Sequence, residues 1–184
     1  MLDYVKFDVI NDIFYIKNNS CIKLIKNIYE ALEPDMNTSP QFKHQRAKSI
    51  LWLLENNFDE ILKAIDYINL SYYNTKTLIE KTNNRFLKIS LGHISYTRAL
   101  LYGRKCSIEG YSDEENIKSA LLYYQEALFN PINKDELDAL RSHKADRRII
   151  DDLKKIIDYI FNADNIDLEI SIEAQMLCEN LNWR

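Results

Sequence analysis

The sequence predicts an all-α protein, with seven to nine helices in stacked helical hairpins that form either a repeat-like array or an irregular bundle. Glycine and proline are scarce: each contributes 3 of the 184 residues, against averages of about 7% and about 5% in soluble proteins. β-Sandwiches, β-barrels and glycine-rich phosphate loops depend on these residues for their turns. Apolar residues also recur at helical spacing along most of the chain, and the length suits one domain, residues 1–184.

Two structures fit the N-terminal segment, residues 1–18. Its apolar spacing favours a helix, whereas its β-branched and aromatic residues suit a short strand. The Asn-Asn-Ser segment at 18–20 can cap a second helix that runs to Leu32. Ser39 and Pro40 then predict the start of another helix, as its N-cap and its first residue.

Two further helices are predicted before residue 82. Asn57 and Glu60 have the spacing of a capping box, which predicts a helix from there to about residue 68. A separate short helix is expected over 70–81. The helix that ends at Asn56 and the helix that begins at Asn57 are joined tightly, so these two would form an antiparallel hairpin.

The helix predicted over 85–105 is the central one of the fold, because its apolar residues surround most of its circumference. Gly92 and Gly103 lie within it, and we expect them at places where a neighbouring helix approaches closely. His93 falls on its apolar stripe with Phe86, which favours a histidine buried in the core over a catalytic base.

Three elements are expected after a loop over 107–111. Ser112 and Glu115 have the spacing of a second capping box, for a helix that stops at Asn130-Pro131. Another helix carries the isoleucines between 149 and 160. The last spans 168–181, although the alternation of apolar residues at 168–172 leaves a short strand open there.

One segment carries a family resemblance. Ala120, Tyr124, Ala127 and Pro131 place small residues seven apart, an aromatic residue between them and a proline after the helix. Residues 96–131 thereby resemble a tetratricopeptide or Sel1-like helical repeat. The resemblance implies protein or peptide binding along a helical groove and no catalysis; the other interpretation is an ordinary amphipathic hairpin.

The net charge of −4 arises entirely near the C-terminus. Residues 1–157 hold 23 basic and 22 acidic side chains, so this part of the chain is almost neutral. From Asp158 onward, six acidic residues face only Arg184. Nucleic-acid-binding proteins usually have a basic face, so the charge argues against nucleic acid as a partner.

Cofactor and compartment signals are sparse. Cys21, Cys106 and Cys178 are far apart, which favours buried thiols in a reducing compartment over a disulfide framework. The sequence contains neither HExxH nor a calcium-binding loop, so no metal and no cofactor is expected. An acidic N-terminus and the lack of a long apolar run predict a cytoplasmic protein that does not enter membranes.

The one polar cluster that could bind phosphate contains Arg141, His143, Arg147 and Arg148. Guanidinium groups suit phosphate because they donate paired hydrogen bonds. Between residues 134 and 155, however, seven basic residues accompany six acidic ones. Such balance is typical of a solvated helix face with ion pairs.

Tyrosine is abundant, with 12 residues. Adjacent tyrosines cannot both face the core of a helical protein, so some should be exposed. We take Tyr96, Tyr102 and Tyr123 as candidate interface anchors, because tyrosine offers a large contact area at a small entropic cost. The other interpretation is that these tyrosines fill the outer core with their hydroxyls in water.

Together these patterns predict a non-catalytic protein-binding domain, either an adaptor or an antagonist of the immunity-protein type. Asp167, Glu169 and Glu173 of the acidic last helix would steer a basic partner protein. Self-association also fits. The alternative is a helical enzyme or regulator that acts on phosphate, nucleotides or RNA through the arginine cluster at 141–148.

Overall fold

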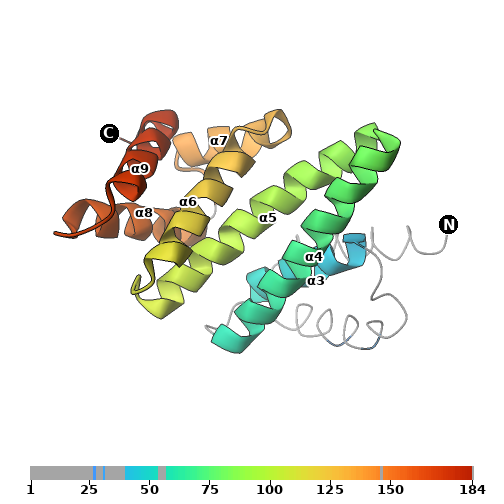
Figure 1. Cartoon of the computed structure of the whole chain (residues 1–184), viewed down its shortest axis with the longest axis horizontal. Helices are drawn as coiled ribbons and strands as arrows, with labels where there is room; N and C mark the ends of the chain where they lie inside the picture. The colour runs from blue at the N-terminus through green and yellow to red at the C-terminus, as the bar shows by residue number, and fades with distance from the viewer. Residues whose placement is uncertain (1–26, 28–30, 32–39, 54–56, 146, 184) are drawn as a thin grey trace.

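The computed structural model describes residues 27, 31, 40–53, 57–145 and 147–183, and these residues are helical almost throughout (Figure 1). They form seven α-helices and one short 3-10 helix, and within them no strand occurs. The all-α prediction is confirmed. The elements are α3 (Pro40–Leu53), α4 (Phe58–Thr82), α5 (Arg85–Glu109), α6 (Glu114–Leu128), η1 (Pro131–Asn133), α7 (Lys134–Arg141), α8 (Arg147–Asn162) and α9 (Leu168–Leu181).

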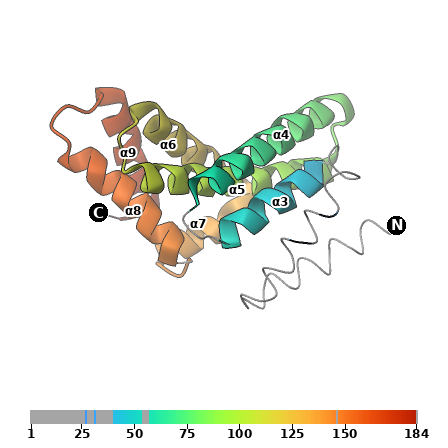
Figure 2. The ribbon, with the colours of Figure 1, turned by 90° about the horizontal axis from the view of Figure 1, so that it is seen from below.

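Helix α5 is the centre of the fold, as its apolar circumference predicts. Helices α4 and α6 lie along its two sides, each joined to it by a short turn, and α8 packs across its C-terminal half (Figures 1 and 2). Helix α3 covers α4, whereas α9 contacts both α6 and α8. The predictions for residues 1–18, for the helix to Leu32, for the Ser39 cap and for Cys21 lie outside the described residues.

Helix α4 is one helix of 25 residues, so the prediction of a separate helix over 70–81 is wrong. Its start is as predicted: the Asn57 side chain accepts a hydrogen bond from the Glu60 backbone N–H at 3.3 Å. The helix continues through the polar residues near 71 because Ser71 Oγ donates to the Pro40 carbonyl of α3, 2.6 Å away. It ends where Asn83 adopts a left-handed conformation (φ 49°).

The turn between α5 and α6 is shorter than predicted. Helix α5 continues to Glu109, where Gly110 (φ 71°) donates its N–H to the Cys106 carbonyl and ends the helix. The N-cap of α6 is Asp113, not Ser112. Its carboxylate accepts from two backbone N–H groups, those of Glu115 and Asn116, whereas the Ser112 hydroxyl donates to the Glu109 carbonyl.

Both helical glycines lie at close approaches, as predicted. A Cβ atom at Gly103 would lie 2.6 Å from Oη of Tyr124 on α6. A Cβ atom at Gly92 would lie 3.0 Å from Cγ2 of Ile132 in η1. Next to Ile132, the buried Asn133 donates to the carbonyls of Gly92 and Ala127, which ties η1 to both α5 and α6.

The C-terminal third contains one helix that the sequence analysis did not separate. Helix α7 ends at Arg141, and a turn in which His143 adopts φ 54° leads to α8. Helix α9 spans Leu168–Leu181 as predicted, and the strand alternative at 168–172 is wrong. The alternation there reflects two faces of one helix, because Ile170 is buried while Leu168 and Ile172 are exposed.

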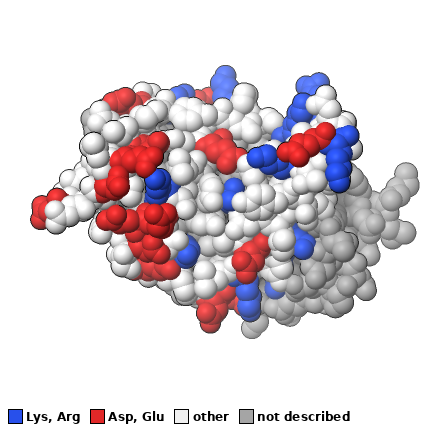
Figure 3. All heavy atoms as spheres, viewed as in Figure 1, with Lys and Arg blue, Asp and Glu red and all other residues white. Residues whose placement is uncertain are grey.

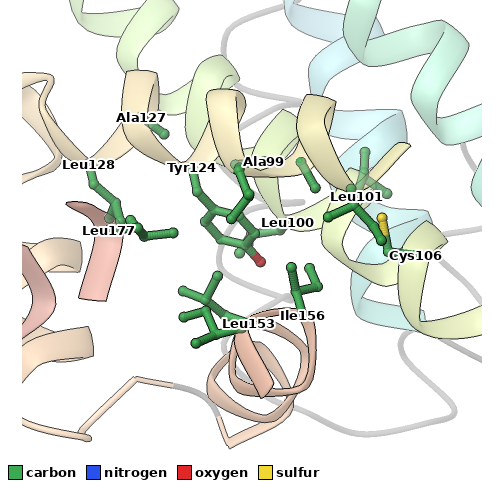
Figure 4. Packing of buried hydrophobic residues seen from close by; sticks show 14 of the residues in the cluster. Ala99, Leu100, Leu101, Cys106, Tyr124, Ala127, Leu128, Leu153, Ile156 and Leu177 are labelled. Carbon is green, nitrogen blue, oxygen red and sulfur yellow. The ribbon is translucent and has the colours of Figure 1, made fainter. Parts of the chain in front are cut away.

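The buried side chains of α3 to α9 form one continuous core. Tyr124 lies at its centre, with its ring between α5 and α8 and Leu153 and Ile156 beside it (Figure 4). Cys106 and Cys178 are buried thiols, which confirms the prediction for the two described cysteines. The prediction for His93 is wrong: this side chain is exposed, because the helix face that it shares with Phe86 lies outside the core.

Candidate functional site

Two of the predicted tyrosines, Tyr102 and Tyr123, belong to what we call the arginine–tyrosine cluster, in which Arg98 of α5 contacts Tyr123 and Tyr72. The guanidinium carbon of this buried side chain lies 3.7 Å from the ring centroid of Tyr123 and 4.5 Å from that of Tyr72. Arg98 Nη2 donates to Tyr123 Oη, and Nε donates to Asn69 Oδ1, both at 2.8 Å. The rings of Tyr102 and Tyr123 meet edge to face with centroids 4.7 Å apart.

The arginine–tyrosine cluster connects helices α4, α5 and α6. Tyr72 on α4 donates its hydroxyl to Glu126 Oε1 on α6 at 2.6 Å, across α5. Burial, then the hydrogen bond and charge of Glu126, raise the pKa of Tyr72, so this hydroxyl stays protonated near neutral pH. Within the described residues, the side chains of Tyr102 and Tyr123 thus contact each other, and Tyr123 also bonds to Arg98 of its own chain.

Tyr96 does not join Tyr102 and Tyr123. It is partly buried against the core and lies close to the buried Tyr124. The reason is helical geometry, since Tyr96 and Tyr102 are six residues apart on one helix and so point about 120° apart. Of the adjacent pair Tyr72 and Tyr73, the second is exposed, which confirms that neighbouring tyrosines divide between core and solvent.

The predicted acidic residues belong to a surface built from two helices, which we call the acidic face. It consists of the N-terminal segments of α6 and α9, and acidic side chains gather at that end of the molecule (Figure 3). Its residues are Asp113, Glu114, Glu115, Asp167, Glu169 and Glu173. Lys118 lies among them: its hydrogen bond to Glu169, and the charges of Glu115 and Asp167, raise its pKa.

Each of the three predicted acidic residues also has a partner within the chain. Asp167 is the N-cap of α9 and accepts from the Glu169 backbone N–H at 2.7 Å. The Glu169 carboxylate pairs with Lys118, and Glu173 accepts from the side chain of Gln125. The sequence pattern does not indicate that α6 contributes carboxylates to this face, because these residues lie about fifty residues earlier in the chain.

An exposed apolar stripe on α9 borders the acidic face. Leu168, Ile172 and Met176 are spaced four residues apart on the helix side opposite the buried Ile170 and Leu177. Leu168 is 74% exposed and Ile172 50% exposed. We call these three residues the α9 stripe. The sequence contains a signal for this stripe, because apolar residues recur on two faces of α9, whereas a surface helix with one buried face carries them on one.

Exposed apolar residues also occur on α6 and at its C-terminal end. Leu122 and the C-cap residue Phe129 are exposed and lie one turn before and one turn after Gln125. Gln125 itself donates to the backbone carbonyl of Glu173 on α9 at 3.3 Å. The exposed apolar side chains of the two helices thus flank a polar contact between α6 and α9.

The predicted phosphate cluster is only partly assembled in the described residues. Arg141 donates from Nε to the Asn180 carbonyl at 2.8 Å and lies 3.6 Å from the Asp138 carboxylate. The His143 ring stacks on the ring of Trp183, with centroids 5.7 Å apart. Arg147 and Arg148 open α8, and their side chains are outside the described residues.

The titratable groups of the interior have structural partners. Arg104 Nη2 and Asp152 Oδ2 form an ion pair of 3.1 Å, and burial raises the pKa of Asp152 although Arg104 opposes the shift. Burial raises the pKa of the Cys106 thiol to about 12, so a nucleophilic thiolate does not form there at neutral pH.

His44 of α3 is the described histidine with a shifted pKa. Its Nε2 lies 3.0 Å from Oγ1 of Thr97, whose hydroxyl also lies 3.1 Å from the His93 carbonyl. Burial, with added repulsion from Lys48 and His93, lowers the pKa of His44 to about 3. The imidazole is therefore neutral at physiological pH and holds α3 to α5.

The described residues form neither a metal site nor a membrane span. There, histidine, cysteine, aspartate and glutamate side chains do not gather in groups that could hold a metal ion. Of the helices in that same part of the chain, none is both long and apolar enough to cross a bilayer.

Comparison with known proteins gives no significant match: no family model fits the chain, and no curated protein and no solved structure resembles it significantly. The resemblance of residues 96–131 to a tetratricopeptide or Sel1-like repeat stays a prediction.

Proposed function

We propose that this protein is a non-catalytic binding domain, an adaptor or an antagonist of the immunity-protein type, that receives a basic, partly apolar segment of another protein on its acidic face and α9 stripe. One observation carries the proposal: the α9 stripe turns three apolar side chains away from the core, beside carboxylates of two helices. Exposed apolar residues bordered by charge are typical of interaction surfaces.

The electrostatics of the acidic face support a basic partner. Glu114 and Glu115 are exposed, and neither forms an ion pair within the described residues. Such carboxylates raise the association rate of a basic partner through long-range attraction. The apolar stripe supplies the contact area, because charge alone contributes little once water and salt screen it. A cytoplasmic location is part of this proposal.

The test uses a synthetic helical peptide of lysine and leucine, with the leucines spaced four residues apart. A scrambled peptide of the same composition keeps the charge and loses the apolar face. We expect the patterned peptide to bind more tightly than the scrambled one by about tenfold, and its association rate to fall as salt rises. Fluorescence anisotropy and stopped-flow mixing measure the two quantities.

A matched pair of variants locates the binding surface. Ile172 is 50% exposed on the α9 stripe, and Leu70 is 47% exposed on α4. Ile172→Ser should weaken binding of the patterned peptide by about fivefold to tenfold, since it removes most of one apolar contact, whereas Leu70→Ser should leave it unchanged. Equal affinities for the two variants, or an association rate that does not respond to salt, would contradict the proposal.

A further inference from the structure

The turn between α4 and α5 forms a second exposed apolar surface, which we call the basic tip. Its basic residues are Lys76, Lys81, Arg85 and Lys88, and its exposed apolar residues are Leu78, Phe86 and Ile89. Glu80 is the one acidic residue between positions 76 and 89, so the tip carries a net charge of about +3 at neutral pH. Basic side chains gather there in Figure 3.

The tip is not neutralised or covered within the described residues. The four basic side chains are all exposed, and none of them forms an ion pair in that part of the chain. Phe86 is 78% exposed. It and Leu168 of the α9 stripe are the two most exposed large apolar side chains among the described residues. The basic tip thus combines exposed apolar residues with charged ones, as the acidic face and the α9 stripe do, but its charge is positive.

We infer that the basic tip of one copy docks on the acidic face and α9 stripe of a second copy. This inference rests on the proposed function, because it identifies the basic apolar segment that the acidic face receives. The argument is complementarity: lysines and Arg85 would meet Glu114, Glu115 and Glu169, while Phe86 would pack on Leu168 and Ile172.

The two surfaces cannot meet within one molecule. The α4–α5 turn and the start of α9 lie at opposite ends of the long axis (Figure 1). Their contact must therefore be intermolecular and head-to-tail. A head-to-tail contact uses different surfaces on the two partners, so each added copy exposes a new binding end and the assembly grows with concentration.

Two charge-reversal variants test this arrangement by sedimentation velocity. Variant T carries Lys81→Glu, Arg85→Glu and Lys88→Glu in the basic tip, and variant F carries Glu114→Lys and Glu115→Lys in the acidic face. The wild-type protein should show a mean mass that rises with concentration up to about 1 mM. Its association constant should fall about tenfold between about 50 mM and about 500 mM NaCl.

Each variant alone should remain monomeric, because T lacks a functional tip and F lacks a functional face. An equimolar mixture of T and F contains the intact pair formed by the tip of F and the face of T. The reversed tip of T and the reversed face of F also carry opposite charges, so the mixture should associate while each variant alone stays monomeric. Association that appears only in the mixture assigns the contact to these two surfaces.

Controls separate this inference from a change in folding or in overall charge. Lys134→Glu, Lys144→Glu and Lys155→Glu reverse three exposed charges outside the tip, and this variant should associate like the wild type. Ile172→Ser keeps every charge and should still weaken association several-fold. Circular dichroism verifies that each variant is helical.

Three outcomes overturn the inference: a wild-type protein that is monomeric at every concentration, variants that associate like wild type, or a monomer whose tip binds anionic phosphatidylserine vesicles instead. The proposed function fails separately. If the wild type is monomeric but binds the patterned basic peptide through Ile172, the acidic face retains its role and only the second copy is wrong as its partner.

Discussion

The two halves of α5 have similar apolar content but different surroundings. The C-terminal half, around Leu101 and Gly103, is enclosed by α4, α6 and α8, and its side chains form the centre of the core. The N-terminal turns, around Phe86 and Ile89, extend beyond α6 and α8 (Figure 1), and their apolar side chains lie in water. The apolar periodicity of the sequence does not distinguish the two halves. Their burial differs because the helices packed against α5 cover only part of its length.

The comparison shows which apolar residues stabilise the fold and which are available for binding. Burial of an apolar side chain contributes roughly 1.5–3 kcal/mol relative to exposure, so the enclosed half contributes most of the stability that α5 provides. The exposed half contributes little to stability, so its Phe86 is available for the contact that we propose. Four substitutions or conditions test this division, beginning with the largest expected effect.

Leu101→Ala should destabilise the protein by about 3 kcal/mol, because it removes a fully buried side chain and leaves a cavity. Ile89→Ala on the exposed half of the same helix should cost less than about 1 kcal/mol. Urea unfolding followed by circular dichroism measures both. Similar losses at the two positions would show that the N-terminal turns of α5 are enclosed after all.

Gly103→Ala should destabilise the protein by about 2 kcal/mol through overpacking. The new Cβ would lie 2.6 Å from Oη and 3.1 Å from Cε2 of Tyr124, whose ring is fully buried and cannot retreat. The better helix propensity of alanine offsets about 1 kcal/mol at an unconstrained site. A stabilised Gly103→Ala protein would mean that the α5–α6 contact is looser than the structure has it.

His44 should make the enclosed half of α5 sensitive to acid. Its pKa is lowered to about 3 in the folded protein and is about 6.5 when unfolded. Between these values the unfolded state binds more protons, so stability falls as pH falls below about 6.5. The loss should reach up to about 2 kcal/mol at about pH 5.

The control for this pH effect is the exposed His93. We expect His44→Gln to flatten the decrease in stability between about pH 7 and about pH 5, and His93→Gln to retain it. Denaturant unfolding at the two pH values provides the comparison. The same slope in both variants would assign the acid sensitivity to other groups.

Phe86→Ser should change the free energy of unfolding least, by less than about 0.5 kcal/mol, because the side chain is 78% exposed. Its effect should appear in self-association, which we expect to weaken about tenfold. Calorimetric unfolding and sedimentation on the same samples separate the two quantities. A large loss of stability with unchanged association would place Phe86 in the core of the fold.

The sequence was sufficient for elements whose ends carry local signals. Asn57, Pro40 and the Asn130-Pro131 segment mark helix boundaries through caps or a missing donor, and these act within one turn. The predicted break near residue 70 failed because Ser71 bonds to the Pro40 carbonyl of another helix. Such a tertiary contact has no local signal.

The candidate site was predicted in part for the same reason. Asp167, Glu169 and Glu173 could be selected from charge distribution, but their neighbours on α6 become visible only when the chain is folded. Tyr123 meets Arg98 and Tyr102 because α6 flanks α5, a placement that spacing does not specify. The apolar alternation at 168–172 leaves a strand open beside the predicted helix, and only the folded helix separates the α9 stripe from the buried face.

Zero-length crosslinking of a mixture of unlabelled and 15N-labelled protein tests the central claim most directly. A carbodiimide joins lysines to carboxylates in contact, and mass spectrometry of mixed-isotope pairs identifies links between different molecules. We predict intermolecular links from Lys81 and Lys88 to Glu114, Glu115 or Glu169, which disappear at high salt. Intermolecular links spread evenly over exposed lysines, with none joining the basic tip to the acidic face, would contradict the account.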